Sequence, residues 1–342
     1  MKEETVSREI HLRERPIDIP TEGNFVLVKS RIPNPKEGQF VVHNIWMSVD
    51  PYMRGRMRGI KTYISPFELN KPLEGSCVGQ VVESKSDRFK IGDFVLSNYG
   101  WREYWVSTET NSVTKIDPKI APIQSYLGIM GLTGLTAYVG LLKVGKLEES
   151  DRKQNTVFIS AAAGAVGSVS CQIAKIMGCR VIGSTGSQEK VSWLLKEAKI
   201  DNAFNYKEMG EENISSHLNR QCPDGIDIYF DNVGGKHLEA AIHNMKTFGI
   251  VVLCGMISQY NLSSPQGLSN LMLAVTNRLR LQGFIVRDHY DMLVEFHANM
   301  TKWIKEEKIK WRETIFEGLE NAPKAFLALF NGQNIGKMLV RL

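Results

Sequence analysis

The sequence predicts an α/β protein made of a doubly wound parallel sheet and a smaller, β-rich domain. Between residues 25 and 116, short β-rich runs are broken by Gly, Pro and Asn, as in an irregular antiparallel or barrel-like domain. From about residue 127 onward, strands alternate with helical stretches, which is typical of a parallel sheet covered on both faces. The 342 residues, 43% of them hydrophobic, are enough for two domains with separate cores.

The β-rich part contains the runs "NFVLVKSRIP", "GQFVVHNIWMSV", "CVGQVVES" and "GDFVLSNYGWREYWVS", in that order. Each run is bounded by turn-forming residues, which predicts short strands. The end of the chain reads as a helix followed by the strand "KMLVRL". Because this strand has no obvious place in the parallel sheet, we expect it to return to the first domain.

The second part begins with the strand "TVFIS". It continues as a helix over 165–177, the strand "RVIGST", a helix over 189–199, the strand "GIDIYFDNV", a helix over 236–245, and the strands "GIVVLCGM" and "LRLQGFIV". Strands separated by helices in this way form βαβ units, in which the strands run parallel. We therefore expect a doubly wound sheet in this half of the chain.

Charge and cysteine content argue against several classes of protein. The formal net charge of +5 comes from 42 basic and 37 acidic residues interleaved along the chain, so no nucleic-acid-binding arm is expected. The N-terminus is charged where a signal peptide would be apolar, and no apolar run approaches the roughly 20 residues that span a bilayer. Five cysteines without a CxxC pair indicate a reducing compartment. We expect a cytoplasmic protein that binds neither nucleic acid nor membrane.

The strand "TVFIS" leads into a turn that resembles a dinucleotide-binding fingerprint, whose six positions are filled by Ala162, Ala163, Gly164, Ala165, Val166 and Gly167. Such a turn brings the backbone close to a pyrophosphate, which faces the N-terminus of the next helix. Gly164 stands where a side chain would push the pyrophosphate away, and Gly167 where the helix approaches the sheet. Ala162 replaces the usual first glycine. The alternative is a buried strand–helix junction without a ligand.

The next strand end indicates which dinucleotide is bound. An NAD site usually has Asp or Glu there, about 20 residues on, to accept a hydrogen bond from the ribose 2′-hydroxyl. Here residues 183–187 read "GSTGS", and Lys190 follows. Hydroxyl groups, a helix start and a lysine favour a 2′-phosphate, so NADPH is predicted over NADH. A solvated helix lysine is the alternative interpretation of Lys190.

Three further segments follow predicted strands, at the edge where open α/β sheets bind ligands. They are residues 231–235, 254–260 and 284–286. Each alone is explained by turn chemistry or core packing, but together they describe a long nucleotide groove.

A series of ordered segments carries a resemblance to a known family: "VDPYMRGRM", "GLTGLTAYVGL", "AAAGAVGSVSCQIAK", "GSTGSQEK", "FNYK", "DNVGG", "CGMISQYN", "LQGFIV" and "NIGK". Over nearly its whole length the chain resembles the zinc-independent medium-chain dehydrogenases/reductases. The likeness is to the branch of the prostaglandin reductases, plant double-bond reductases and bacterial curcumin reductases. It implies a GroES-like, β-rich catalytic domain over 1–127 and 301–342 and a Rossmann NADP-binding domain over 128–300.

The wider superfamily includes alcohol dehydrogenases that hold a catalytic zinc ion with an early Cys and a later Gly-His-Glu. This chain has "WMSVDP" and "EGSC" at those places, and its cysteines do not cluster as a structural zinc lobe would require. We therefore expect no zinc. Interconversion of carbonyls and alcohols loses its usual Lewis acid without zinc, whereas reduction of an activated C=C bond does not need one.

The resemblance implies NADPH-dependent reduction of the C=C bond of α,β-unsaturated aldehydes and ketones, by hydride transfer to the β-carbon. Tyr260 would stabilise the enolate oxygen, because a phenol is protonated at neutral pH and can donate to it. The alternative is that Tyr260 only lines the groove and takes no part in the chemistry. The implied cofactor groove consists of Gly164, Ala165, Val166, Gly167, Lys190, Tyr206, Asn232, Cys254, Gly255, Ser258, Tyr260, Phe284, Ile285, Val286 and Asn334.

Aromatic residues of the first domain are candidates for the substrate side, together with Tyr260: Tyr52, Tyr99 and Trp101. They suit a small hydrophobic enal or enone, although aromatic residues in β-domains are usually core. Two other functions stay open, a quinone reductase of the same superfamily and a non-catalytic NADPH-binding structural protein. Family likeness also suggests a homodimer formed along the cofactor domains.

Overall fold

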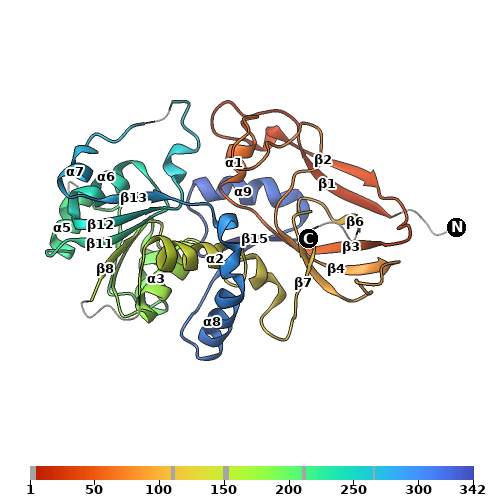
Figure 1. The fold of residues 1–342 in the computed structure, drawn as a ribbon. Coiled ribbons are helices and arrows are strands. Elements are labelled where there is room, and N and C mark those ends of the chain that lie inside the picture. Colours follow the sequence, from red (N-terminus) through yellow and green to blue (C-terminus); the bar gives the residue numbers. More distant parts are fainter. Residues whose placement is uncertain (1–4, 109–111, 149–153, 210–212, 265) are drawn as a thin grey trace. The chain divides into compact units, whose positions relative to one another are not determined.

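The computed structural model describes residues 5–108, 112–148, 154–209, 213–264 and 266–342, and Figure 1 shows their helices and strands. The chain divides into two compact units. The first combines Met1–Gly128 with Glu313–Leu342, and the second is Ile129–Arg312. The boundary expected between residues 300 and 301 would fall inside helix α8 (Leu293–Lys305), whereas the units divide after that helix has ended.

The first unit is built from short strands. They are β1 (Val6–Leu12), β2 (Phe25–Arg31), β3 (Gln39–Ser48), β4 (Cys77–Ser84), β5 (Phe94–Ser97), β6 (Tyr104–Thr108), β7 (Thr114–Lys115), β14 (Glu313–Glu317) and β15 (Lys337–Arg341). Within the described residues, β1 and β2 form an antiparallel pair, and the other strands form one sheet of order β14-β15-β3-β4-β5-β7, with β6 paired to β3. The β-rich runs of the sequence predicted this unit, and the prediction is confirmed.

The end of the chain completes the larger sheet of the first unit. Strand β15 lies between β14, to which it is parallel, and β3, to which it is antiparallel. Lys337, at the start of β15, is buried, and its Nζ donates to Asp50 Oδ1 at 3.0 Å and to the Val49 carbonyl at 3.1 Å. This ion pair fastens the last strand to the loop that follows β3. The helices of this unit are η1 (Glu22–Asn24), α1 (Met53–Arg56), η2 (Ile123–Leu127), η6 (Leu319–Asn321) and α9 (Ala322–Phe330).

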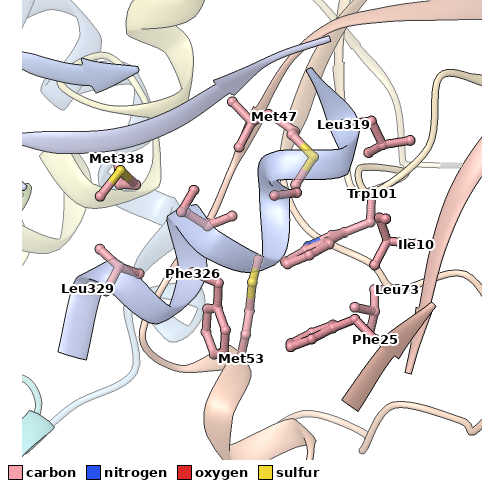
Figure 2. Packing of buried hydrophobic residues seen from close by; sticks show 14 of the residues in the cluster. Ile10, Phe25, Met47, Met53, Leu73, Trp101, Leu319, Phe326, Leu329 and Met338 are labelled. Carbon is pink, nitrogen blue, oxygen red and sulfur yellow. The ribbon is translucent and has the colours of Figure 1, made fainter. Parts of the chain in front are cut away.

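A cluster of buried aliphatic, aromatic and sulfur-containing side chains forms a large part of the core of the first unit (Figure 2). Trp101 is fully buried, and its ring is stacked with that of Phe25 at 6.0 Å between centroids. Phe326 of α9 lies edge-on to Trp101 at 6.4 Å. Each fully buried side chain of this kind contributes roughly 1.5–3 kcal/mol of transfer free energy. The C-terminal helix is therefore an integral part of this core.

The second unit contains a six-stranded parallel sheet among the residues described. Its strands are β8 (Thr156–Ile159), β9 (Arg180–Thr185), β10 (Asn202–Asn205), β11 (Ile226–Asp231), β12 (Met245–Leu253) and β13 (Arg280–Gly283), in the order β10-β9-β8-β11-β12-β13. The predicted doubly wound α/β fold is confirmed. The strand order reverses between β8 and β11, and open α/β sheets bind their ligands at such a switch point, outside the carboxyl ends of the strands.

Helices connect the strands of the second unit, and some end as their sequences predict. They are α2 (Leu132–Val139), η3 (Gly140–Val144), α3 (Gly167–Ile176), α4 (Gln188–Lys196), α5 (Ile214–Gln221), α6 (Gly235–Asn244), η4 (Ile257–Gln259), α7 (Met272–Thr276), η5 (Val286–Met292) and α8. Helix α3 ends at Ile176, two residues before Gly178, whose φ of 81° is the left-handed conformation that glycine adopts at helix ends. No helix in the described parts of the chain combines the length and apolar character needed to cross a membrane.

Candidate functional site

The turn between β8 and α3 requires glycine at residue 167 on steric grounds and leaves little space for a side chain at residue 164. A Cβ at Gly167 would lie 2.3 Å from the Ala161 carbonyl oxygen, and a Cβ at Gly164 would lie 3.2 Å from the same atom. Ala161 itself has a φ of 47°, so the bend is tight. The start of α3 thus approaches the turn closely, with its first N–H groups at the sheet edge where an anion would bind.

Ala162 fits in place of the first glycine because the neighbouring strand provides space for its methyl group. A Cβ at Gly183 of β9 would lie 2.7 Å from the Ala162 Cβ. The backbone of Ala162 is held by the same strand, since its N–H donates to the Ser184 carbonyl at 2.9 Å. Alanine at residue 162 departs from the usual fingerprint, and Gly183 on the neighbouring strand leaves the space that its methyl group occupies.

Basic side chains gather where β9 leads into α4. Ser187 caps the helix and accepts from the Lys190 backbone N–H at 3.4 Å. The Lys190 side chain is 9% exposed, and burial lowers its pKa; the charge of Lys207 lowers it further, and Glu189 opposes this shift. A Cβ at Gly186 would lie 3.2 Å from Lys207 Cε, so Lys207 also reaches this strand end. Two lysines that repel each other beside a helix N-terminus suit a phosphate dianion.

Lys207 was missed by the sequence reasoning. It follows Tyr206 in the segment "FNYK", which is one of the segments that carry the family resemblance, and an exposed lysine in a loop carries no signal of its own.

Tyr206 lies beside the same strand end and packs on a buried histidine. Its N–H donates to the Thr185 carbonyl at 3.0 Å, and its side chain stays 38% exposed. The ring meets His237 edge-on at 4.8 Å between centroids. Burial lowers the pKa of His237 to about 4, so this imidazole is neutral at pH 7. The aromatic rings of Tyr206 and His237 therefore lie beside the strand end that Lys207 reaches.

Asn232 lies at the switch point, where it links the ends of β8 and β11. Its Nδ2 donates to the Ser160 carbonyl at 2.8 Å, and its backbone N–H donates to Ser160 Oγ at 3.0 Å. Ser160 follows β8 directly. The amide of Asn232 is thereby fixed next to the turn that begins the nucleotide fingerprint.

The segment after β12 folds back on the loop after β11. The N–H groups of Cys254 and Gly255 both donate to the Asp231 carbonyl at 3.0 Å, and Ser258 Oγ donates to the Val233 carbonyl at 2.6 Å. Burial, with Asp231 nearby, raises the pKa of the Cys254 thiol to about 12, so the thiol is protonated and unreactive at neutral pH.

Tyr260 is positioned by the same segment. Its Oη accepts from the Met256 N–H at 3.4 Å, and a Cβ at Gly255 would lie 3.1 Å from that oxygen. Glycine at residue 255 therefore leaves room for the phenol oxygen next to the backbone.

The predicted residues after β13 lie at the same sheet edge. Phe284 follows β13 and packs against Gly140, where a Cβ would lie 3.0 Å from its ring. Ile285 caps η5, and Val286 begins it. Because all strands of this sheet are parallel, the ends of β8, β9, β11, β12 and β13 share one edge. The structure brings the predicted residues of the second unit together along that edge.

The other predicted site residues belong to the first unit. Asn334 is half-buried, and its Nδ2 donates to the Gly336 carbonyl at 2.9 Å. Tyr52 packs against the core at the start of α1, and Tyr99 is stacked with Trp105 at 4.5 Å between centroids. Trp101 is a fully buried core residue, so Tyr52 and Tyr99 are the aromatic candidates for the substrate side.

The edge of the parallel sheet fits an NADP-type dinucleotide. It offers a close backbone turn for a pyrophosphate, a lysine pair for a further phosphate, and the glycine-rich loop after β11. Buried polar atoms at or beside the strand ends have no hydrogen-bond partner within the described residues, namely Ser184 Oγ, Asp231 Oδ2 and His237 Nε2. No group of three or more His, Cys, Asp or Glu side chains that could hold a metal ion occurs among the described residues.

Comparisons with known proteins agree with this geometry. Residues 8–116 match the family model of the N-terminal domain of oxidoreductases, and residues 165–304 match that of zinc-binding dehydrogenases. A 2-alkenal reductase (NADP(+)-dependent) of Nicotiana tabacum is 43% identical, over 99% of this chain and 98% of that protein. An NADPH-dependent curcumin reductase of Escherichia coli is 38% identical over 97% of this chain and 95% of its own length.

A solved structure extends the likeness to three dimensions. The crystal structure of CurA from Vibrio vulnificus in complex with NADPH superposes with a TM-score of 0.90 at 39% identity, and covers 98% of each chain. Similarity of this extent, over both units, shows the family. The chain belongs to the zinc-independent branch of the medium-chain dehydrogenases/reductases that includes the alkenal, curcumin and prostaglandin reductases.

Proposed function

We propose that this protein uses NADPH to reduce the C=C bond of α,β-unsaturated aldehydes and ketones. The observation that carries the proposal is the placement of Tyr260 and of the lysine pair Lys190 and Lys207 along one edge of the parallel sheet. The lysines stand where an NAD site would have a carboxylate. The names of the tobacco and Escherichia coli relatives support both the cofactor and the substrate class.

The residues of the chain have separable roles in this reaction. Lys190 and Lys207 hold the 2′-phosphate, and the turn at residues 164–167 receives the pyrophosphate. When bound, NADPH would supply a hydride to the β-carbon of the substrate and leave as NADP⁺, and a proton from solvent would add to the α-carbon to complete the reduction. Tyr260 donates a hydrogen bond to the carbonyl oxygen, where negative charge develops. The Met256 N–H that donates to Tyr260 Oη polarises the hydroxyl and makes it a better donor.

One assay tests the proposal. The purified protein is given NADPH together with an enal, an enone or a quinone, and the absorbance of the reduced cofactor is followed. We expect turnover with the enal and the enone. Turnover with the quinone alone would make the protein a quinone reductase, and cofactor binding without turnover of any of the three would make it a non-catalytic nucleotide-binding protein.

We also propose that two copies pair along strand β13. This strand ends one side of the sheet order, and unpaired strand edges invite pairing with a second chain. Apolar side chains are exposed on helix α7 just before it, among them Met272 at 74% and Val275 at 72%. Light scattering during size exclusion should report a dimer. The double variant Met272→Glu with Val275→Glu should be a monomer. A monomeric native protein would contradict the pairing.

The cytoplasmic location stays a prediction.

A further inference from the structure

Asp231, the last residue of β11, has no role in the function proposed so far, yet it is the most densely bonded side chain at the switch point. Its side chain is fully buried. Its Oδ1 accepts from the N–H groups of Val233 and Gly234 at 2.9 and 2.8 Å. These bonds close the backbone of the loop after β11 into a compact turn. The same turn carries Asn232.

Two hydroxyl groups complete the surroundings of this oxygen. Tyr229 Oη donates to Asp231 Oδ1 at 2.7 Å, and Ser160 Oγ lies 3.3 Å from it. Ser160 Oγ in turn accepts from the Asn232 N–H at 3.0 Å. One carboxylate oxygen therefore ties the turn after β11 to the end of β8. Every bond at Oδ1 is donated to it, as a carboxylate requires.

These contacts join the two strands between which the sheet order reverses. Ser160 belongs to the side that begins the pyrophosphate turn, and Asn232 belongs to the opposite side. A ligand bound at a switch point touches both sides, so their separation and the shape of the turn decide how well it fits. Asp231 is fully buried, so its carboxylate presents no accessible surface at this edge of the sheet.

We infer that Asp231 is a positioning residue of the nucleotide site, which holds the Asn232–Gly234 turn against Ser160 in the shape that receives the dinucleotide. This inference rests on the proposed function. This positioning role differs from recognition by charge. The turn that Asp231 shapes would contact a part of the ligand that NADPH and NADH share. Loss of Asp231 should therefore weaken NADPH and NADH by the same factor, whereas loss of Lys190 or Lys207 should weaken NADPH alone.

The test is the affinity for NADPH and for NADH, measured by fluorescence titration at a temperature well below the unfolding midpoint of each variant. Asp231→Ala removes the acceptor of several hydrogen bonds, and we expect both dissociation constants to rise at least tenfold. Asp231→Asn keeps an oxygen that can accept the Val233 and Gly234 N–H bonds. It should restore the affinity to within about threefold of the native protein.

Two matched Tyr→Phe variants distinguish an effect on the nucleotide site from a general loss of stability. Tyr229 and Tyr138 are both fully buried, and both donate to a carboxylate, that of Asp231 at 2.7 Å and that of Glu295 in α8 at 2.5 Å. Tyr229→Phe should weaken both cofactors about threefold to tenfold. Tyr138→Phe should lower the unfolding midpoint and leave the affinities unchanged. This pair also decides the matter if Asp231→Ala does not fold.

Clear outcomes overturn the inference. It is wrong if folded Asp231→Ala binds NADPH within twofold of the native protein, or if Tyr138→Phe and Tyr229→Phe weaken binding equally. Native protein that binds no NADPH would instead overturn the proposed function, and with it the role of Asp231. Native protein that binds NADPH but reduces no enal, enone or quinone would remove the catalytic proposal and leave the positioning role intact.

Discussion

The ends of strands β9 and β11 lie at one edge of the same sheet and are built in opposite ways. At the end of β9, Lys190 and Lys207 repel each other beside a helix N-terminus, and Lys207 is exposed. At the end of β11, Asp231 is buried, and its Oδ1 is surrounded by donors from its own chain. In the function that we propose, the first region selects the ligand by charge, and the second gives the binding turn its shape. The two regions should therefore respond differently to mutation, salt and pH.

The largest effect is expected from removing the charge at the end of β9. Lys190→Ala with Lys207→Ala should raise the dissociation constant of NADPH at least 100-fold, because two charge-assisted contacts to a phosphate are lost. NADH affinity should stay the same. Higher salt should weaken NADPH binding to the native protein and have little effect on the double variant.

Lys196→Ala is the control for that variant, since this lysine is exposed in the last turn of the same helix α4. Its affinity for NADPH should equal that of the native protein. Equal losses of NADPH and NADH in the double variant would contradict recognition of the 2′-phosphate by these lysines.

His237 contacts residues beside both regions, because its ring packs on Tyr206 and its backbone N–H donates to the Gly234 carbonyl at 3.2 Å. It should make stability depend on pH. Burial holds its pKa at about 4, below the value of about 6.5 in an unfolded chain. As the pH falls from about 6.5 to about 4, the unfolded state binds a proton that the folded state does not. The free energy of unfolding should therefore fall by up to about 3 kcal/mol over this range.

His237→Phe keeps an aromatic ring against Tyr206 and removes the titrating group. Urea unfolding at pH 7 and at pH 4.5 measures the free energy of unfolding of the native protein and of His237→Phe. The difference between the two pH values is then compared for the two proteins. The variant should lose distinctly less stability on acidification, and an identical loss in both proteins would show that His237 does not contribute.

Tyr260 belongs to the second region, because its segment is bonded to the loop after β11. Tyr260→Phe should lower kcat about 100-fold, the size expected when one donor to a developing oxyanion is removed. The dissociation constant of NADPH should not change, in contrast to the lysine variants. Tyr290→Phe, at a tyrosine that is 47% exposed, serves as the control. A variant at Tyr260 with native kcat would assign the phenol to the groove wall.

The smallest effect tests the close packing between β8 and β9. Gly183→Ala places a methyl group 2.7 Å from the Ala162 Cβ, which should lower the free energy of unfolding by about 2 kcal/mol. Ala162→Gly in the same chain removes one of the two methyl groups and should restore part of that loss. Chemical denaturation of the two single variants and the double variant measures the coupling. Additive effects would mean that the two positions do not compensate each other.

The sequence predicts the parts of the molecule that are governed by local periodicity and steric rules. Alternating strands and helices predict the parallel sheet, and the fingerprint frame predicts glycine at residues 164 and 167, where a Cβ would crowd the Ala161 carbonyl. The absence of an acidic residue at the end of β9, in residues 183–187, predicts the cofactor that the relatives use.

Features that depend on distant contacts were not predicted. Trp101 has the appearance of a pocket residue in sequence, and only its packing on Phe25 and Phe326 makes it core. Lys207 and Asp231 look like ordinary loop and turn residues. The roles that we propose for them depend on neighbours on other strands, which no local pattern reveals. The roles of the individual site residues stay predictions until the variants are measured.

The ion pair between Lys337 and Asp50 has a consequence for the order in which the protein matures on the ribosome. The second unit is continuous in sequence, so its sheet can close while later residues are still being added. The first unit needs β15 between β14 and β3, and its buried lysine reaches back across 287 positions. Such long loop closure is slow. The β-rich unit should therefore be the last to mature, and it should depend most on chaperones during synthesis.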